Sequence, residues 1–63
     1  MPRDKAIRQG DITRLAFEML GKEEAIAFLN AENPRLGGRP IALAAESPAG
    51  QLHVETELRR LKP

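Results

Sequence analysis

Cysteine, tryptophan and tyrosine are absent from this 63-residue sequence, and its aromatic side chains are limited to Phe17 and Phe28. Without cysteine there is no disulfide framework and no thiolate metal site. A chain of this length forms one domain at most and buries only about 60% of the surface that the unfolded chain exposes. We therefore expect a thin core that gains stability from a binding partner.

Neither sign of charge dominates, because ten Lys or Arg residues stand against nine Asp or Glu residues. A dedicated nucleic-acid-binding protein usually carries a strong basic excess, so the composition argues against direct binding of DNA or RNA. Hydrophobic runs are only a few residues long, which argues against a membrane-spanning helix. The polar N-terminus also lacks the apolar core of a signal peptide, and we expect a cytoplasmic protein.

Helical periodicity dominates, while a single valine and the lack of tyrosine leave little signal for strands. Residues 1–10 are charged and show little periodicity, so we expect a flexible leader before a domain over residues 11–63. Asp11 is a good N-cap for a first helix over residues 12–20. Gly21 then stands where a left-handed C-terminal residue belongs.

Three more helices are predicted after Gly21. The second runs from about residue 23 to residue 30, and its buried face is expected to consist of Ala25, Ile26, Phe28 and Leu29. Pro40 is well placed as the first residue of a short third helix.

The start of the last helix is indicated by Ser47 as N-cap, with Pro48 after it, and we expect Gly50 to weaken its first turn. The apolar positions Val54, Leu58 and Leu61 fall on one face of this helix. The predicted architecture is therefore a compact all-α domain of about four short helices.

The segment over residues 33–40 reads Asn-Pro-Arg-Leu-Gly-Gly-Arg-Pro and separates the second helix from the third. Its prolines lack amide donors and its glycine pair disfavours helix, so we predict a rigid loop. Leu36 is expected to pack inward. Arg35 and Arg39 then remain as charges for solvent or for a partner.

Residues suited to catalysis are scarce. His53 is the single histidine, and Glu57 follows at helical spacing, which is most simply a surface pair. A metal site needs three or four suitable ligands, which one histidine and scattered carboxylates do not supply. The pair Gly37-Gly38 lacks the preceding strand and the Lys-Ser or Lys-Thr of a phosphate-binding loop. We expect no enzyme activity, no catalytic residue, no cofactor and no metal.

Several motifs follow one another in a characteristic order from about residue 12 to residue 61. They are Ala16-Phe17-Glu18-Met19-Leu20-Gly21, Phe28-Leu29, Asn33-Pro34-Arg35-Leu36-Gly37-Gly38-Arg39-Pro40, Leu43, Gly50, Val54, Leu58 and Leu61. This order resembles the toxin-binding domain of the MbcA/ParS/Xre family of antitoxins. One departure is Phe28, which stands where a tryptophan is commoner in the family.

The resemblance implies an antitoxin of a bacterial type II toxin–antitoxin pair. Its partner would be a RES-domain toxin, an enzyme that degrades NAD or transfers ADP-ribose, and its C-terminal part would cover the toxin's NAD cleft. The candidate toxin contacts in this chain are Arg35, Arg39, Gln51, His53, Glu55, Glu57, Arg59, Arg60 and Lys62. We further hypothesise that Glu55 and Glu57 occupy sites for the NAD phosphates, which need cationic partners on the toxin.

Two alternatives remain open at this point. The first is a DNA-binding autoregulator, since most members of the family carry a helix-turn-helix domain before this one. Residues 1–10 are too few to encode such a domain, so the chain is either a stand-alone antitoxin or part of a longer protein. The second is a generic helical dimerisation domain, and the sequence does not decide between a homodimer and a hetero-oligomer with the toxin.

Overall fold

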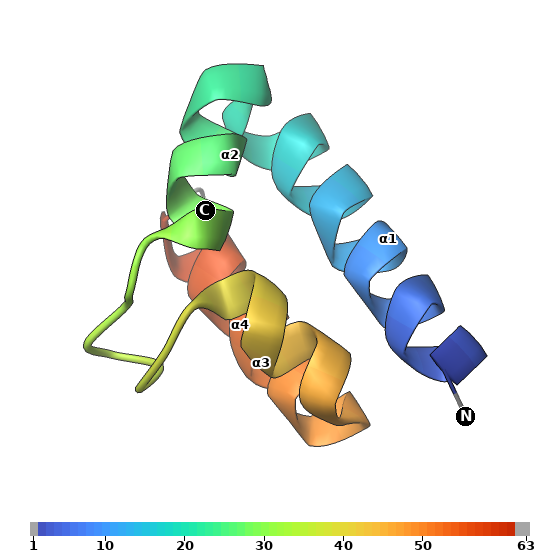
Figure 1. The fold of residues 1–63 in the computed structure, drawn as a ribbon. Helices are drawn as coiled ribbons and strands as arrows, with labels where there is room; N and C mark the ends of the chain where they lie inside the picture. Colours follow the sequence, from blue (N-terminus) through green and yellow to red (C-terminus); the bar gives the residue numbers. More distant parts are fainter. Residues whose placement is uncertain (1, 62–63) are drawn as a thin grey trace.

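The computed structural model describes residues 2–61, with side chains described for residues 4–61. Four helices follow in order: α1 (Pro2–Leu20), α2 (Lys22–Asn30), α3 (Pro40–Glu46) and α4 (Pro48–Leu61). Helices α3 and α4 form an antiparallel hairpin, α1 lies along it, and α2 connects the end of α1 to the loop that precedes α3 (Figure 1). The predicted all-α class with four helices is confirmed.

Helix α1 starts at Pro2, so the prediction that the first helix begins at residue 12 is wrong. The segment predicted as a flexible leader is helical over residues 2–10, and Met1 lies outside the described residues. Proline is compatible with the first turn of a helix because its missing amide would have no partner there. Asp11 is therefore not an N-cap; it lies inside α1 and pairs with Arg14 at 3.5 Å.

Three helix ends lie where the sequence predicted them. Gly21 has a φ of 85° and its N–H donates to the Phe17 carbonyl at 2.9 Å, so it ends α1 as predicted. Pro40 occupies the start of α3. The Ser47 Oγ accepts the N–H of Gly50 at 3.0 Å, which confirms its role as the N-cap of α4.

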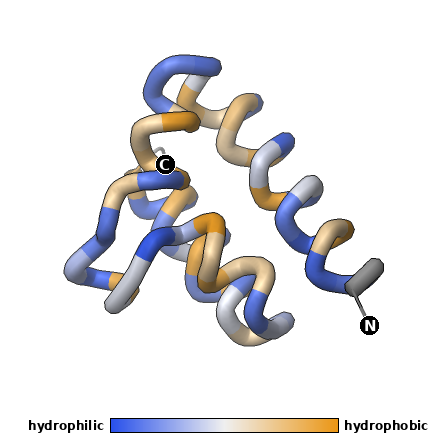
Figure 2. Tube along the Cα trace, viewed as in Figure 1, coloured by the Kyte–Doolittle hydropathy of each residue, from blue (hydrophilic) through white to orange (hydrophobic). Residues whose placement is uncertain are grey.

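One core connects the four helices, and Figure 2 shows hydrophobic residues on each of them. Its buried members are Ile12, Ala16, Ala25, Leu29, Ala44, Val54 and Leu58. Two residues predicted to be buried are not, because Ile26 is 45% exposed and Leu61 is 44% exposed. Leu61 lies in the last turn of α4, where it borders a surface hollow, while Ile26 lies on a different side of α2 from Ala25 and Leu29.

Gly50 has a packing function that the sequence did not reveal. A Cβ atom at this position would collide with the backbone carbonyl of Leu43 in α3. A glycine therefore allows the backbones of α3 and α4 to approach closely at the start of their hairpin. The expectation that Gly50 weakens the first turn of α4 stays a prediction.

The loop between α2 and α3 is organised by Asn33. Its carbonyl accepts the N–H groups of Leu36 and Gly37 at 3.0 and 2.8 Å, and its own N–H donates to the Gly38 carbonyl at 2.9 Å. Its side-chain Oδ1 accepts the N–H of Arg35 at 2.9 Å. Gly37 has a φ of 82°, which favours glycine. The loop that was predicted to be rigid is thus a turn closed by hydrogen bonds to one asparagine.

Candidate functional site

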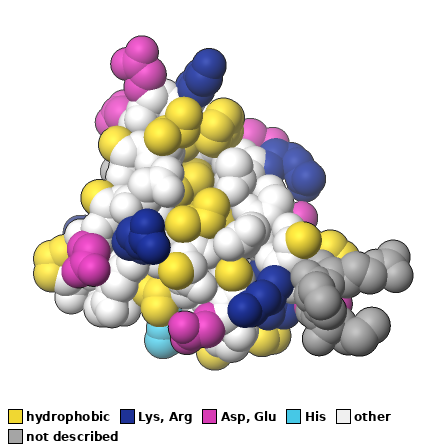
Figure 3. All heavy atoms as spheres, in the orientation of Figure 1, with side chains coloured by type: hydrophobic (Ala, Val, Ile, Leu, Met, Phe, Trp, Pro, Cys, Tyr) yellow, Lys and Arg dark blue, Asp and Glu magenta, His cyan; other side chains and the backbone are white. Residues whose placement is uncertain are grey.

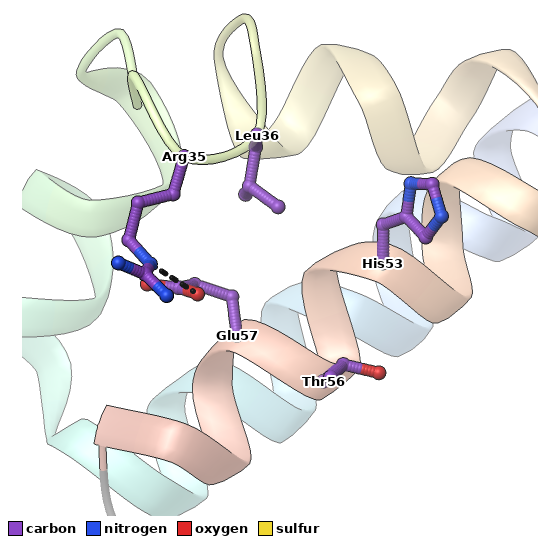
Figure 4. A pocket seen from close by; sticks show the side chains of 5 residues that line it. All are labelled: Arg35, Leu36, His53, Thr56 and Glu57. Atoms are coloured by element: carbon purple, nitrogen blue, oxygen red, sulfur yellow. Dashed lines mark hydrogen bonds and ion pairs between the residues drawn. The ribbon is translucent and has the colours of Figure 1, made fainter.

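An open depression of about 530 Å³ lies where this loop meets α4. Arg35 and Leu36 line it from the loop, and His53, Thr56 and Glu57 line it from one side of α4 (Figure 4). The helical residues share a side because positions three and four apart are neighbours on a helix surface. The loop thereby becomes a wall of a site whose floor is α4.

Glu57 is the central residue of this site and is buried, with its side chain only 8% exposed. Its Oε1 accepts hydrogen bonds from the Nε atoms of both Arg35 and Arg60, at 3.3 and 3.2 Å. Its Oε2 accepts a third from Arg60 Nη2 at 2.8 Å. We call Arg35, Glu57 and Arg60 the arginine clasp, because it ties the loop to the helix.

The clasp changes the protonation chemistry of both residues on α4. The hydrogen bond from Arg60 is the main cause that holds the pKa of Glu57 below its ordinary value, and the charge of Arg35 acts in the same direction. Burial opposes this effect but does not overcome it. The same hydrogen bond raises the pKa of Arg60. Glu57 is therefore a carboxylate at neutral pH and Arg60 is a cation.

The predicted pair of His53 with Glu57 is not among the contacts of the described side chains. Both oxygens of Glu57 accept hydrogen bonds from arginines instead. His53 is exposed and lines the depression further along α4 (Figure 4). It contributes to the surface rather than to the clasp.

The other predicted contact residues lie apart from the depression. Arg59 pairs with Glu55 at 3.8 Å along α4. Arg39 is exposed at the start of α3, and Gln51 is half-buried near the start of α4. Lys62 lies outside the described residues. The structure therefore joins the predicted Arg35, His53, Glu57 and Arg60 into one site and leaves the rest around it.

Two contact residues were not predicted from the sequence: Thr56 at the depression and Arg8 where α1 meets α3. Thr56 lines the depression, and its position three residues after His53 was an available signal. Arg8 of α1 donates to the carbonyls of Ala44 and Ala45 at 3.1 and 2.6 Å, which satisfies acceptors in the last turn of α3. No sequence pattern marks that contact, because it joins residues far apart in the chain.

Apolar surface is also exposed away from the clasp. Figure 3 shows hydrophobic side chains gathered along the middle of one face, with charged side chains toward its edges. A hollow of about 360 Å³ is lined by Leu20, Glu24, Ala27, Phe28 and Leu61, from α1, α2 and the end of α4. Phe28 thus borders this hollow and packs against the core.

Two further properties concern the described residues alone. Within residues 2–61, no three or more His, Asp or Glu side chains are grouped so that they could hold a metal ion. No helix in that part of the chain is both long and apolar enough to cross a membrane.

The described residues form a small helical domain whose candidate site is an open depression bordered by charged side chains. Such a site is better suited to contact with another macromolecule than to enclosing a small ligand. The model of the antitoxin Xre/MbcA/ParS C-terminal toxin-binding domain matches residues 15–62, so the chain belongs to this family. The matched range contains the loop, the arginine clasp and the whole of α4. No curated protein and no solved structure matched the chain. The domain is therefore that of an antitoxin whose partner is a toxin.

Proposed function

We propose that this domain neutralises a RES-domain toxin from the same bacterial operon, by covering the toxin's NAD cleft with the end of α4. It acts in the cytoplasm as an inhibitor and has no catalysis of its own. The observation that carries the proposal is the family match, which spans the loop and all of α4. A marginal core of this size gains stability from such a partner, because binding favours the folded state.

The end of α4 has the chemistry of a contact surface. The side chains of Arg59 and Arg60 are 69% and 49% exposed, and Leu61 exposes an apolar side chain beside them. Arginine and large apolar groups are the usual energetic anchors of protein interfaces. These residues project from a helix, so a partner meets them on a rigid element.

Of the two carboxylates considered for the NAD-phosphate sites, Glu55 is the accessible one. Glu57 is buried and already accepts three hydrogen bonds from the clasp arginines. Glu55 has only a long pair with Arg59, at 3.8 Å, and exposed pairs of this kind contribute little stability. A cation in the toxin's cleft can therefore replace Arg59 as its partner at little cost.

Steady-state inhibition tests the proposed cleft blockade. The purified RES-domain enzyme encoded beside this chain should consume NAD more slowly when the domain is added. Because the domain and NAD would compete for one cleft, the apparent inhibition constant of the domain should rise linearly with the NAD concentration. Inhibition that is independent of NAD would contradict blockade of the cleft, and a lack of binding would contradict the RES partner.

A matched pair of variants tests the role of Glu55. Glu55→Gln removes the charge of the half-buried Glu55 from α4 and should weaken inhibition, while Glu46→Gln removes one exposed charge from the end of α3 and should not. Thermal unfolding checks that both variants fold. Truncation before Glu57 is a poor test, because it also removes the buried Leu58. Equal inhibition by both variants would remove Glu55 from the contact.

A further inference from the structure

We propose that Arg35 and Arg60 form a preorganised receptor for a carboxylate side chain, an Asp or Glu on the surface of the toxin. The inference rests on the proposed toxin partner and adds the chemistry that the partner presents at this point. It follows from the net charge of the clasp, from the arginine N–H groups that Glu57 does not bind, and from the burial of Glu57 beneath both arginines.

The clasp carries a surplus of positive charge. Two guanidinium groups share the single carboxylate of Glu57, and both Nε atoms contact the same oxygen. Two cations and one anion therefore leave the clasp with one net positive charge. A second anion that contacts both guanidinium groups would balance this charge.

The other ion pairs described for the chain show no such surplus. Arg14 pairs with Asp11, and Arg59 pairs with Glu55, so each cation has its own anion. Arg35, which lines the depression, and Arg60, which pairs with the same carboxylate, thus offer an incoming carboxylate two cations that share one anion.

Donor groups remain available for that carboxylate. Arg35 uses only Nε toward Glu57, while Arg60 uses Nε and Nη2. Among the described residues, the two Nη groups of Arg35 and the Nη1 of Arg60 have no hydrogen-bond partner. The guanidinium fork matches the geometry of a carboxylate and commonly binds it through two parallel hydrogen bonds.

Glu57 also prepares both arginines for binding. Its side chain is 8% exposed, whereas those of Arg35 and Arg60 are 61% and 49% exposed. A buried anchor therefore holds two accessible cations in place before the partner arrives. Side chains that are already ordered lose less conformational entropy on binding. Arg59 is more exposed, at 69%, but its partner Glu55 is itself 31% exposed, so Arg59 lacks a buried anchor.

The first experiment uses the domain alone and follows the Nε–Hε signals of its arginines by NMR. The probes are a capped hexaglutamate peptide and inorganic phosphate, each titrated at constant ionic strength. We expect saturable shifts for Arg35 and Arg60 with the peptide, and only small shifts for Arg14 and Arg59. Equal shifts at all four arginines, or a response to phosphate alone, would overturn the proposal.

The second experiment measures the Kd for the toxin. Arg35→Gln and Arg60→Gln should each raise the Kd by about tenfold, because they remove an anchored donor pair. The matched control Arg14→Gln, in the exposed pair of α1, should change it by no more than about twofold. Arg35→Lys keeps the charge without the fork and should still bind severalfold more weakly than the unmodified domain.

These results separate the two proposals. Unchanged affinity of both clasp variants, or full affinity of Arg35→Lys, overturns the carboxylate receptor and leaves the toxin partner in place. A lack of binding by the unmodified domain overturns the partner itself. Thermal unfolding of each variant distinguishes a lost contact from a lost fold, and the lysine variant replaces any glutamine variant that does not fold.

Discussion

The two halves of α4 are held to the rest of the molecule by different forces. Its first half packs against α3 through the backbone, with Gly50 against the Leu43 carbonyl and Ser47 as the cap. Its second half buries Leu58 in the core and is also tied to the loop by the ion pairs of Glu57 with Arg35 and Arg60. The first contact is steric and buried, while the second places charges at the surface.

This difference separates support from recognition along a single helix. Close backbone packing does not respond to salt or to moderate changes of pH, so it fixes the direction of α4. Exposed charges are screened by salt and can exchange partners. Variants that disrupt buried contacts should therefore reduce stability more than variants that remove charged contacts at the surface.

Leu58→Ala should give the largest loss of stability, because Leu58 is fully buried where α4 meets the core. Large-to-small changes in a core usually cost about 2–5 kcal/mol of unfolding free energy. Urea unfolding followed by circular dichroism measures the loss. Leu61→Ala is the control on the same face, and its 44% exposed side chain should make the cost much smaller. Similar losses for both variants would show that the core extends further along α4.

Gly50→Ala should separate the α3–α4 hairpin, since the added Cβ collides with backbone rather than with a flexible side chain. Overpacking of this kind costs about 1–3 kcal/mol of unfolding free energy. Gly10→Ala adds the same methyl group to a helical position with no atom within 4 Å. That control should stabilise the domain by about 0.5–1 kcal/mol. If both variants were stabilised, the close approach at Gly50 would be disproved.

Arg8→Ala should detach the first half of α1 from the end of α3. It removes two hydrogen bonds to the Ala44 and Ala45 carbonyls, which should cost about 1–2 kcal/mol of unfolding free energy. Hydrogen exchange should also become faster in residues 4–10. Lys5→Ala, a change at an exposed site in the same segment, is the control. Unchanged exchange in the Arg8 variant would mean that this segment is held by other contacts.

Glu57→Gln should have the smallest effect on global stability and a clear effect on its pH dependence. Because the folded-state pKa of Glu57 lies below its ordinary value of 4.5, the charged form stabilises the fold fully above that value. The contribution is lost as pH falls through the lowered pKa. The stability difference between the two proteins should therefore shrink below about pH 4.5. A difference that is constant from pH 7 to pH 3 would exclude the clasp as its source.

Sequence patterns predicted the elements whose signals are local. Gly21, Pro40 and Ser47 mark helix ends through their own backbone or capping chemistry, and the structure places them as expected. The rigid loop over residues 33–40 was predicted for the same reason. Family membership also followed from the order of the motifs and is confirmed by the match over residues 15–62.

The remaining features depend on contacts between distant residues. Helix α1 starts earlier than predicted, and its Arg8 contacts residues that lie 36 and 37 positions later in the chain. The approach of Gly50 to Leu43 and the 22-residue separation of Arg35 and Glu57 are equally invisible to periodicity. Spacing suggested His53 as the partner of Glu57, but the loop delivers Arg35 to the same carboxylate instead.

We propose that the loop and the second half of α4 together form the toxin-binding surface. Hydrogen exchange of the domain, measured free and in complex with the toxin, distinguishes this surface from the rest of the molecule. New protection is expected in residues 33–39 and 53–61, with unchanged exchange in residues 4–10. Protection confined to α1 and α2, with none in the loop or in α4, would contradict it.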